Sequence, residues 1–191
     1  GDWKMMDLNY FYYFLGNGLL LLASYPMIYI FEKLFGFLSD VTLLELSDTN
    51  NQLLRDLADK APGTFQHSIT VANLAEEAIY RIGGNPLLAR TGALYHDIGK
   101  INMPQFFIEN QLFGHNPHDE LSCEESAGII ISHVTKGVEL ALKNGLPEPV
   151  IDFIRGHHGT SRVEYFYRMC KHKNPDTEPD ETLFRYPGIL P

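Results

Sequence analysis

Histidines recur along this chain at the ends of apolar segments, and this pattern limits the folds that the chain can adopt. Five of the eight histidines belong to the series, together with one aspartate that directly follows a histidine. A neutral imidazole is a good ligand for a transition metal, and an adjacent carboxylate can bridge two ions. Such a set exceeds what one tetrahedral site needs, so it predicts a fold that gathers two metals. In chain order the residues are His67, His96, Asp97, His133, His157 and His158.

The segments that carry these residues have helical periodicity, and no β-alternation of useful length is present. We therefore predict an all-α fold, a helical bundle with a metal site in its core. Thr64 is expected to cap a long helix that follows a stop at Pro62-Gly63, and the proline-rich tail 173–191 is expected to be irregular. The predicted helices cover 52–60, 65–82, 87–98, 121–143, 147–156 and 160–171.

Helical spacing indicates which way the histidines point. His67 would share a face with Val71, Leu74, Ala78 and Ile82, and His96 with the small residues Ala89, Gly92 and Ala93. A single histidine on an apolar face is more often a hydrogen-bonded core residue than a ligand. Several buried imidazoles without partners would cost about 1–3 kcal/mol each, whereas shared metals satisfy them together. We therefore expect every imidazole of the series to face the bundle interior.

The other histidines, His115, His118 and His172, lie in polar sequence, and a structural role is expected for them. His115 and His118 could still line the mouth of a pocket. Cys123 and Cys170 lack the CxxC spacing of metal or redox sites, so both are expected to be ordinary thiols in a reducing compartment.

The net charge of −9 argues against binding of a nucleic-acid polymer, which requires clustered lysine and arginine. An anionic substrate would then need local positive charge, and divalent metals are the obvious source.

Residues 1–38 differ from the rest because 10–38 are almost wholly apolar, with Glu32 and Lys33 as their only charged residues. Residues 10–31 are long enough to cross a membrane, and their tyrosines suit its interface. We therefore predict a membrane-derived or juxtamembrane helix. The alternative is that this helix docks on the domain that follows. We expect that domain to cover residues 39–191.

The motif His96-Asp97-Ile98-Gly99-Lys100, with His67 before it, resembles the HD superfamily of metal-dependent phosphohydrolases. The additional His133 and His157-His158 are similar to its two-metal branch, which includes cyclic dinucleotide phosphodiesterases. The subgroup with a Gly-Tyr-Pro signature is disfavoured, because Gly-Thr-Ser-Arg follows His158.

The chain resembles most closely the seven-transmembrane HD receptors of the PgpH type. The resemblance rests on 43–47, 61–68, 71–76, 85–90, 95–100 and 106–111, and it covers roughly residues 30–191. It implies hydrolysis of cyclic di-AMP to 5′-pApA by a membrane-tethered enzyme whose catalytic domain is cytoplasmic. It also accounts for the apolar N-terminus as the end of a membrane helix.

The resemblance also implies the ligand sets. His67, His96 and Asp97 would hold the first metal, and His133, His157 and His158 the second, with Asp97 bridging both. Two such ions lower the pKa of a shared water, so a bridging hydroxide attacks the phosphodiester. The family favours iron or manganese, and zinc also suits these ligands.

Residues near the ligands are candidates for substrate contact. Lys100 could reach a phosphate oxygen, or it could be an exposed lysine at a helix end. Thr160, Ser161 and Arg162 directly follow the histidine pair and could contact phosphate or ribose. The family also has a later aspartate on the first metal, and no suitable residue follows here, so we expect the sequence to stop early.

Two other functions stay open at this point. One is an HD hydrolase of another nucleotide, such as cyclic di-GMP or guanosine tetraphosphate. The other is a nucleotide-sensing module whose metal site is structural. Adenine and guanine differ only in base-edge contacts, which the sequence does not reveal.

Overall fold

The computed structural model describes residues 8–111 and 116–188 and divides the chain into two compact units, 1–42 and 43–191. Helices account for the regular structure of the described residues, and the only β-pairing there is an isolated bridge between Arg162 and Arg185. The all-α prediction is therefore confirmed. The α-helices are α1 (Leu8–Phe35), α2 (Asp40–Ser47), α3 (Gln52–Lys60), α4 (Pro62–Ile82), α5 (Pro86–Tyr95), α6 (Cys123–Lys143), α7 (Glu148–Gly156) and α8 (Glu164–Lys173).

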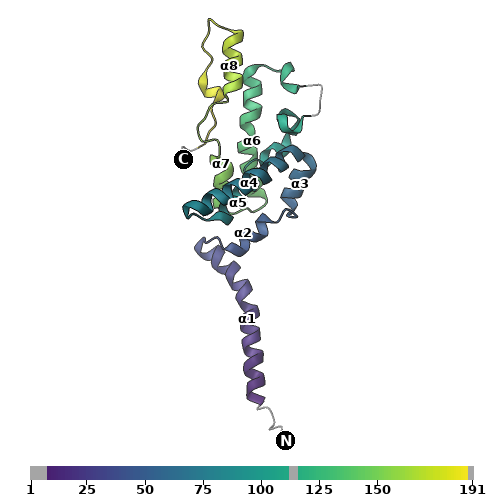
Figure 1. Ribbon diagram of the computed structural model, residues 1–191, viewed down its shortest axis with the longest axis vertical. Helices are drawn as coiled ribbons and strands as arrows, with labels where there is room; N and C mark the ends of the chain where they lie inside the picture. The colour runs from purple at the N-terminus through teal and green to yellow at the C-terminus, as the bar shows by residue number, and fades with distance from the viewer. Residues whose placement is uncertain (1–7, 112–115, 189–191) are drawn as a thin grey trace. The chain divides into compact units, whose positions relative to one another are not determined.

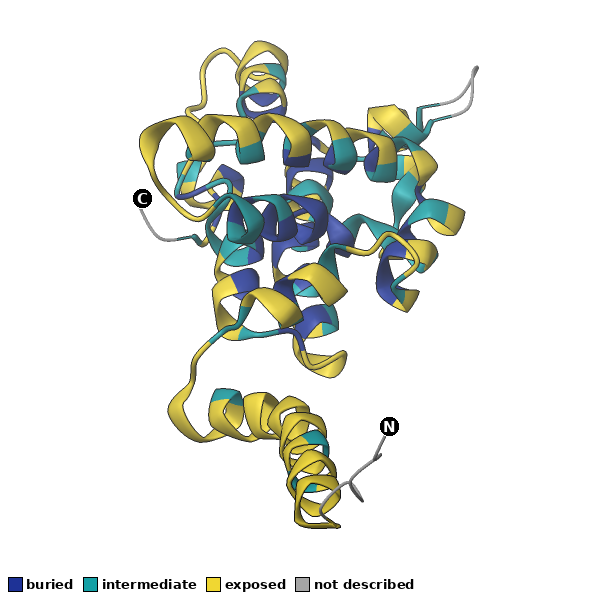
Figure 2. Cartoon of the chain, turned by 60° about the horizontal axis from the view of Figure 1, so that its bottom comes forward, coloured by how far each residue is buried: buried dark blue, intermediate teal, exposed yellow. Residues whose placement is uncertain are grey.

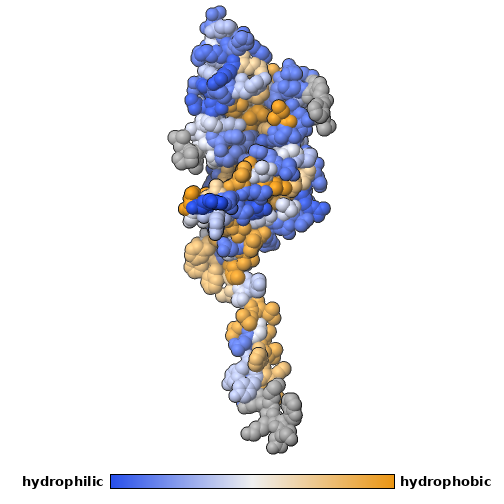
Figure 3. Space-filling model, in the orientation of Figure 1, coloured by the Kyte–Doolittle hydropathy of each residue, from blue (hydrophilic) through white to orange (hydrophobic). Residues whose placement is uncertain are grey.

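The first unit consists mainly of α1, which is apolar and has no buried residue. Figure 3 shows mostly hydrophobic side chains along this helix. By length and composition α1 could cross a membrane. In the last turns of α1 the Glu32 carboxylate accepts hydrogen bonds from the Ser39 backbone and the Thr42 hydroxyl, which fix the turn into α2.

The second unit is a helical bundle in which α4 lies beside α5, and α6 packs against α7 and α8 (Figure 1). Its buried residues line the inner faces of the helices (Figure 2). Side-chain caps begin three of these helices, since Asn51, Asn85 and Ser122 each accept a hydrogen bond from the first turn. The predicted helix over 52–60 matches α3.

The long helix α4 begins earlier than predicted. Pro62 occupies its first turn, where a missing N–H costs nothing, so Pro62-Gly63 starts this helix as well as ending the one before. Thr64 therefore does not cap α4. Its hydroxyl donates instead to the Glu109 carboxylate at 3.0 Å, and a Cβ on Gly63 would meet the Glu109 carbonyl.

Other segments also differ from the prediction, including α8, which begins at Glu164 rather than at 160 and ends at Lys173 rather than at 171. Helix α5 ends at Tyr95, and a short 3₁₀ helix, η1 (Ile98–Asn102), follows directly. The tail is only partly irregular, because it contains η5 (Glu181–Phe184), and Phe184 is fully buried. The remaining 3₁₀ turns lie between the predicted helices 87–98 and 121–143, and they are η2 (Pro104–Phe106), η3 (Ile108–Asn110) and η4 (Pro117–Glu120).

Candidate metal centre

The His96-Asp97 pair lies where α5 ends and η1 begins, and η1 is pressed directly onto α6. Gly99 makes this contact possible, because a Cβ there would lie 1.8 Å from the His133 carbonyl oxygen. On α6 itself Gly137 provides similar space, since a Cβ there would meet Ile154 of α7 at 2.8 Å. Small residues thus bring the Asp97 backbone close to the helices that carry the later histidines.

Three of the imidazoles are oriented by one common device. In each, Nδ1 lies within hydrogen-bond distance of the carbonyl oxygen three residues earlier: 2.6 Å for His96, 2.5 Å for His133 and 2.9 Å for His157. Because a carbonyl only accepts, Nδ1 carries the proton and Nε2 turns toward the interior. A carbonyl partner of this kind fixes the tautomer that a metal-binding histidine needs.

The Asp97 carboxylate lies between these Nε2 atoms. Its Oδ1 is 3.3 Å from Nε2 of His133 and 3.6 Å from Nε2 of His157, while Oδ2 is 3.2 Å from Nε2 of His96. Burial raises the pKa of this carboxyl, but the surrounding imidazoles outweigh burial and hold the pKa well below its usual range. Asp97 is therefore an ionised carboxylate in a nearly dry site.

The buried Oδ1 of Asp97 accepts no hydrogen bond from any described residue. It faces His133 and His157, whose own Nε2 atoms are only 3.2 Å apart and whose protons are on Nδ1. With neutral imidazoles three lone pairs converge here without a donor, which is costly unless a proton or a metal cation lies among them. The residues therefore fit a divalent metal at this position.

Each of the six predicted ligands belongs to one of two groups whose ligand atoms lie within 4.8 Å of one another. Asp97 is common to both groups. The His158 imidazole has a pKa lowered to about 3 by burial and by the nearby His157 and His133, so it is neutral at physiological pH. The first group is His67, His96 and Asp97, and the second is Asp97, His133, His157 and His158.

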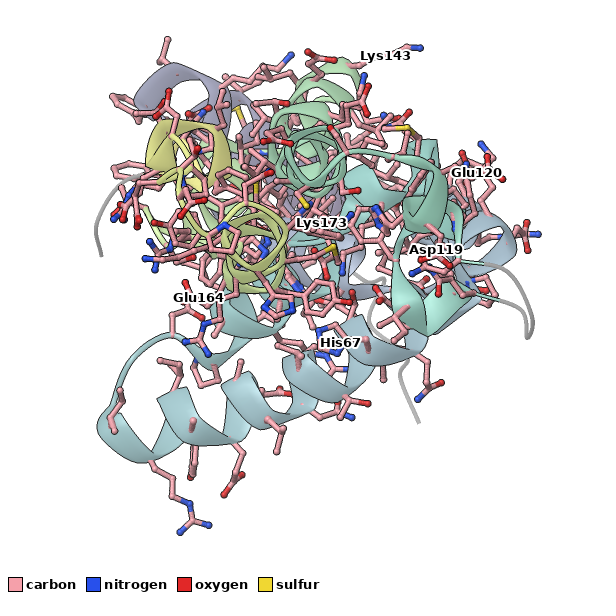
Figure 4. All side chains as sticks on the ribbon, turned by 90° about the horizontal axis from the view of Figure 1, so that it is seen from above. His67, Asp119, Glu120, Lys143, Glu164 and Lys173 are labelled. Atoms are coloured by element: carbon pink, nitrogen blue, oxygen red, sulfur yellow. The ribbon has the colours of Figure 1, made fainter. Side chains whose placement is uncertain are left out.

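The predicted orientation of His67 is wrong. This residue is exposed, and the buried stripe of α4 consists of Thr64, Ser68 and Ala72. The apolar residues thought to share its face include Leu74 and Ile82, which are also exposed. His67 still reaches the centre from the edge of α4 (Figure 4), because its ring lies 5.6 Å from the ring of His96.

Lys100 is not a free lysine at a helix end, since its side chain is only 13% exposed. Its Nζ lies 2.8 Å from both Asp97 Oδ2 and Glu109 Oε1, and 4.9 Å from the centre of the Phe107 ring. Burial lowers the pKa of this ammonium, but Asp97 and Glu109 outweigh burial and raise it. Its contact with substrate stays a prediction.

The segment after the histidine pair makes mostly internal contacts. The Arg162 guanidinium pairs with Glu164 and Glu181 and lies 3.8 Å from the Tyr167 ring centre. The Thr160 carbonyl accepts from Arg185, and the Ser161 carbonyl accepts from the Tyr186 backbone. The structure therefore gives Arg162 two carboxylate partners, and its predicted substrate contact would require it to leave them.

A cavity of about 400 Å³ lies beside the centre. Phe107 lines this cavity, and its ring centre lies 5.7 Å from that of His133. Glu109 also lines the cavity and pairs with Lys100. His118 lines this cavity, whereas His115 falls outside the described residues and His172 is exposed on α8. The aromatic rings of the lining are Phe106, Phe107, His118, Tyr165 and Phe166.

Sequence reasoning did not single out Glu109 or Tyr186. Glu109 lies in a stretch, Phe106 to Gln111, that was noted only as part of the family resemblance. An acidic residue among aromatic ones was the available signal. Tyr186 lies in the tail that was expected to be irregular, yet its ring stacks on His158 with centres 4.0 Å apart.

Comparisons with known proteins agree with this geometry. The HD domain family model matches residues 64–184. A Listeria monocytogenes protein, the cyclic-di-AMP phosphodiesterase PgpH, is 46% identical over 180 residues, which are 94% of this chain and 25% of that protein. The Bacillus subtilis protein of the same name is 48% identical over 161 residues, which are 84% of this chain and 22% of that protein.

Among solved structures, the L. monocytogenes PgpH HD domain in complex with cyclic di-AMP matches with a TM-score of 0.71 and 49% identity. The match covers 75% of this chain and 66% of that one. The chain thus spans about a quarter of the length of the curated relatives that it matches.

Proposed function

Because the chain belongs to the HD domain family, we propose that it is a metal-dependent phosphodiesterase that hydrolyses cyclic di-AMP to 5′-pApA. Two relatives with the same name, cyclic-di-AMP phosphodiesterase, match most of its length. A solved relative of 49% identity binds cyclic di-AMP. These likenesses support both the reaction class and the substrate.

The observation that carries the proposal is the position of Asp97 between two groups of histidines. One carboxylate belongs to both groups, and its Oδ1 has no hydrogen-bond donor among the described residues. A purely structural tetrahedral site would need neither a shared ligand nor two groups. Asp97 is therefore proposed to bridge two ions, with His67 and His96 on one side and His133, His157 and His158 on the other.

Nitrogen-rich ligands with one bridging carboxylate suit iron or manganese, and zinc is a further candidate. When bound, two such ions would supply a nucleophile from water and positive charge for the phosphodiester oxygens. The carbonyl-bonded imidazoles hold their Nε2 atoms in place before any ion arrives. The low pKa of Asp97 keeps its carboxylate ionised at neutral pH.

Lys100 is proposed to act at the same carboxylate. Its ammonium balances the charge of Asp97, while Glu109 holds the ammonium from the opposite side. With ions bound at Asp97, the Lys100 ammonium could direct a remaining N–H toward a phosphate oxygen. Thr160, Ser161 and Arg162 are secondary candidates for contact with ribose or phosphate.

The aromatic cavity is proposed to receive an adenine base. A purine is planar and apolar on its faces, and stacking on aromatic side chains contributes about 1–3 kcal/mol per base. The cavity is of ligand size and lies against the His133 surroundings, so a base there would leave its phosphate near the metals. Polar residues at its wall, Glu109, Gln111 and Asn116, can bond to the base edge.

We further propose that α1 lies in the membrane and that the HD domain is cytoplasmic, where a nucleotide second messenger is available. The support is the continuous exposure of large apolar side chains along α1. A soluble protein rarely exposes so extended an apolar surface.

The direct test is turnover of cyclic di-AMP and cyclic di-GMP by the full-length protein with added Mn²⁺. We expect 5′-pApA from the first, and at least a tenfold loss of turnover in Asp97→Asn and in His96→Ala. A matched control is His172→Ala, which removes an exposed histidine of α8 outside both ligand groups.

The other outcomes separate the alternatives. Faster hydrolysis of cyclic di-GMP or guanosine tetraphosphate would show that the protein is an HD hydrolase with a different nucleotide substrate. Tight binding of a dinucleotide without turnover of any would favour the sensing module with a structural metal site.

A further inference from the structure

The segment Phe184–Gly188, here called the C-terminal strap, runs antiparallel to the residues that follow the histidine pair. Three backbone hydrogen bonds join them: from Val163 to the Phe184 carbonyl at 2.7 Å, and from Tyr186 and Gly188 to carbonyls of the 159–161 segment at 3.0 and 3.1 Å. A Cβ on Gly188 would lie 2.3 Å from the Gly159 carbonyl oxygen. The strap can therefore lie this close only because residue 188 has no side chain.

This register places the Tyr186 ring directly on a metal-ligand candidate. Tyr186 is 8% exposed, and its ring is stacked on the His158 imidazole with centres 4.0 Å apart and planes 14° apart. The same ring meets His133 edge-on at 6.0 Å. Offset or edge-to-face pairs of this kind contribute about 0.5–1.5 kcal/mol beyond burial.

His158, which is half-buried, differs from three of the other predicted histidine ligands in how its ring is held. His96, His133 and His157 each have a carbonyl partner at Nδ1. No hydrogen bond from a residue in the described ranges holds the His158 ring, so packing alone sets its orientation. Its closest ring neighbours are Tyr186 and His157, whose centres lie 4.0 and 4.1 Å away.

We infer that Tyr186 is a positioning residue for the metal centre. It holds His158 by stacking, whereas His96, His133 and His157 are held by a carbonyl. The inference rests on the proposed metal-binding function. Tyr186 lies two residues beyond the segment that the HD domain family model matches, so the domain pattern does not assign it this role. The aromatic ring of Tyr186 orients His158, because the two rings are stacked face to face. The Tyr186 hydroxyl is therefore not needed for this role.

The test uses full-length protein with Tyr186→Phe, which keeps the ring, and Tyr186→Met, which fills the space without one. Two quantities are measured: the NMR shift of the His158 ring protons without metal, and the affinity for Mn²⁺ by calorimetry. The Phe variant should match the wild type in both. In the Met variant the His158 protons should lose their ring-current shift, and one Mn²⁺ should bind about 10–100-fold more weakly.

Phe184→Leu is the matched control, since Phe184 belongs to the same strap and is fully buried but contacts Tyr167 rather than a histidine. It should lower the melting temperature with little change in Mn²⁺ affinity. An equal loss of affinity in Phe184→Leu and Tyr186→Met would overturn the inference, as would wild-type affinity in Tyr186→Met.

Two further results keep the tests separate. Contacts between the Tyr186 and His158 rings in NMR spectra of the wild type alone test the packing, even if the Met variant does not fold. Wild-type protein that binds no Mn²⁺ would instead contradict the proposed function, and with it any metal-related role of Tyr186.

Discussion

The Lys100 ammonium nitrogen lies 2.8 Å from Oδ2 of Asp97, while Oδ1 of the same carboxylate accepts no hydrogen bond from the described residues. One oxygen thus has an ammonium partner in the protein, and the other faces two histidine nitrogens, those of His133 and His157. The two oxygens therefore differ in charge balance, because Oδ2 has a cationic partner and Oδ1 has none among the described residues. We therefore predict that Lys100 and a bound metal both stabilise the fold by balancing the charge of Asp97.

Lys100→Met should destabilise the metal-free protein by about 3 kcal/mol, because it leaves a buried carboxylate without its cation. With Mn²⁺ bound the loss should be much smaller, since the ion supplies the missing charge. Urea unfolding with and without Mn²⁺ measures both values.

The control for that experiment is Lys143→Met, which removes an exposed lysine at the end of α6. It should change stability by a few tenths of a kcal/mol at most, with or without metal. A Lys100→Met loss that is the same in both conditions would show that metal and lysine do not share Asp97.

Gly99→Ala should disrupt the centre by forcing η1 away from α6. The new Cβ would lie 1.8 Å from a backbone oxygen that cannot rotate away, so we expect a loss of about 3 kcal/mol and weaker Mn²⁺ binding. Gly128→Ala is the opposite case, because this glycine lies in α6, the helix that η1 packs against, with open space around it. That variant should gain about 0.5–1 kcal/mol. Similar stabilities for the two variants would contradict the packing.

Metal binding should release a proton from His96 near neutral pH. Burial lowers the pKa of this imidazole, but Asp97 and the Ala93 carbonyl outweigh burial and raise it above its ordinary value. The charged pair therefore stabilises the metal-free protein fully below about pH 6.5, and this stabilisation is lost as pH rises through the folded pKa.

Because the metal needs the neutral imidazole, Mn²⁺ affinity should rise with pH over that same range, by up to about tenfold per unit. Calorimetry in two buffers of different ionisation enthalpy counts the released protons. Affinity that is unchanged between pH 6 and 8 would argue that His96 is not a ligand.

Tyr165→Ala should weaken substrate binding if the aromatic cavity takes a base. Loss of one stacking face is expected to raise KM for cyclic di-AMP about tenfold and to leave kcat nearly unchanged. Tyr80→Ala is the control, since Tyr80 is equally exposed but lies on α4 away from the cavity. Equal effects of the two substitutions on KM would contradict binding of the base in this cavity.

The histidine series and the helical periodicity were enough to predict an all-α fold and to nominate the residues that form both ligand groups. They failed where contacts between distant segments decide the outcome. Thr64 was expected to be a cap because threonine favours that position, but Pro62 starts the helix and Glu109 takes the hydroxyl.

The error at His67 has a related cause. Several small and polar residues of α4 are buried and several large apolar ones are exposed, so apolar periodicity selected the wrong face. Tyr186 could not be placed because its position depends on backbone pairing with the 159–163 segment, which leaves no periodic signal in a proline-rich tail.

Asp97 is proposed to join two metal ions, and electron paramagnetic resonance of the Mn²⁺-loaded, full-length protein can detect such a pair. Two ions that share a carboxylate are close enough to couple magnetically. We predict the signal of an exchange-coupled manganese pair in the wild type and its loss in Asp97→Asn. A wild-type spectrum of isolated Mn²⁺ ions at saturating metal would contradict bridging by Asp97.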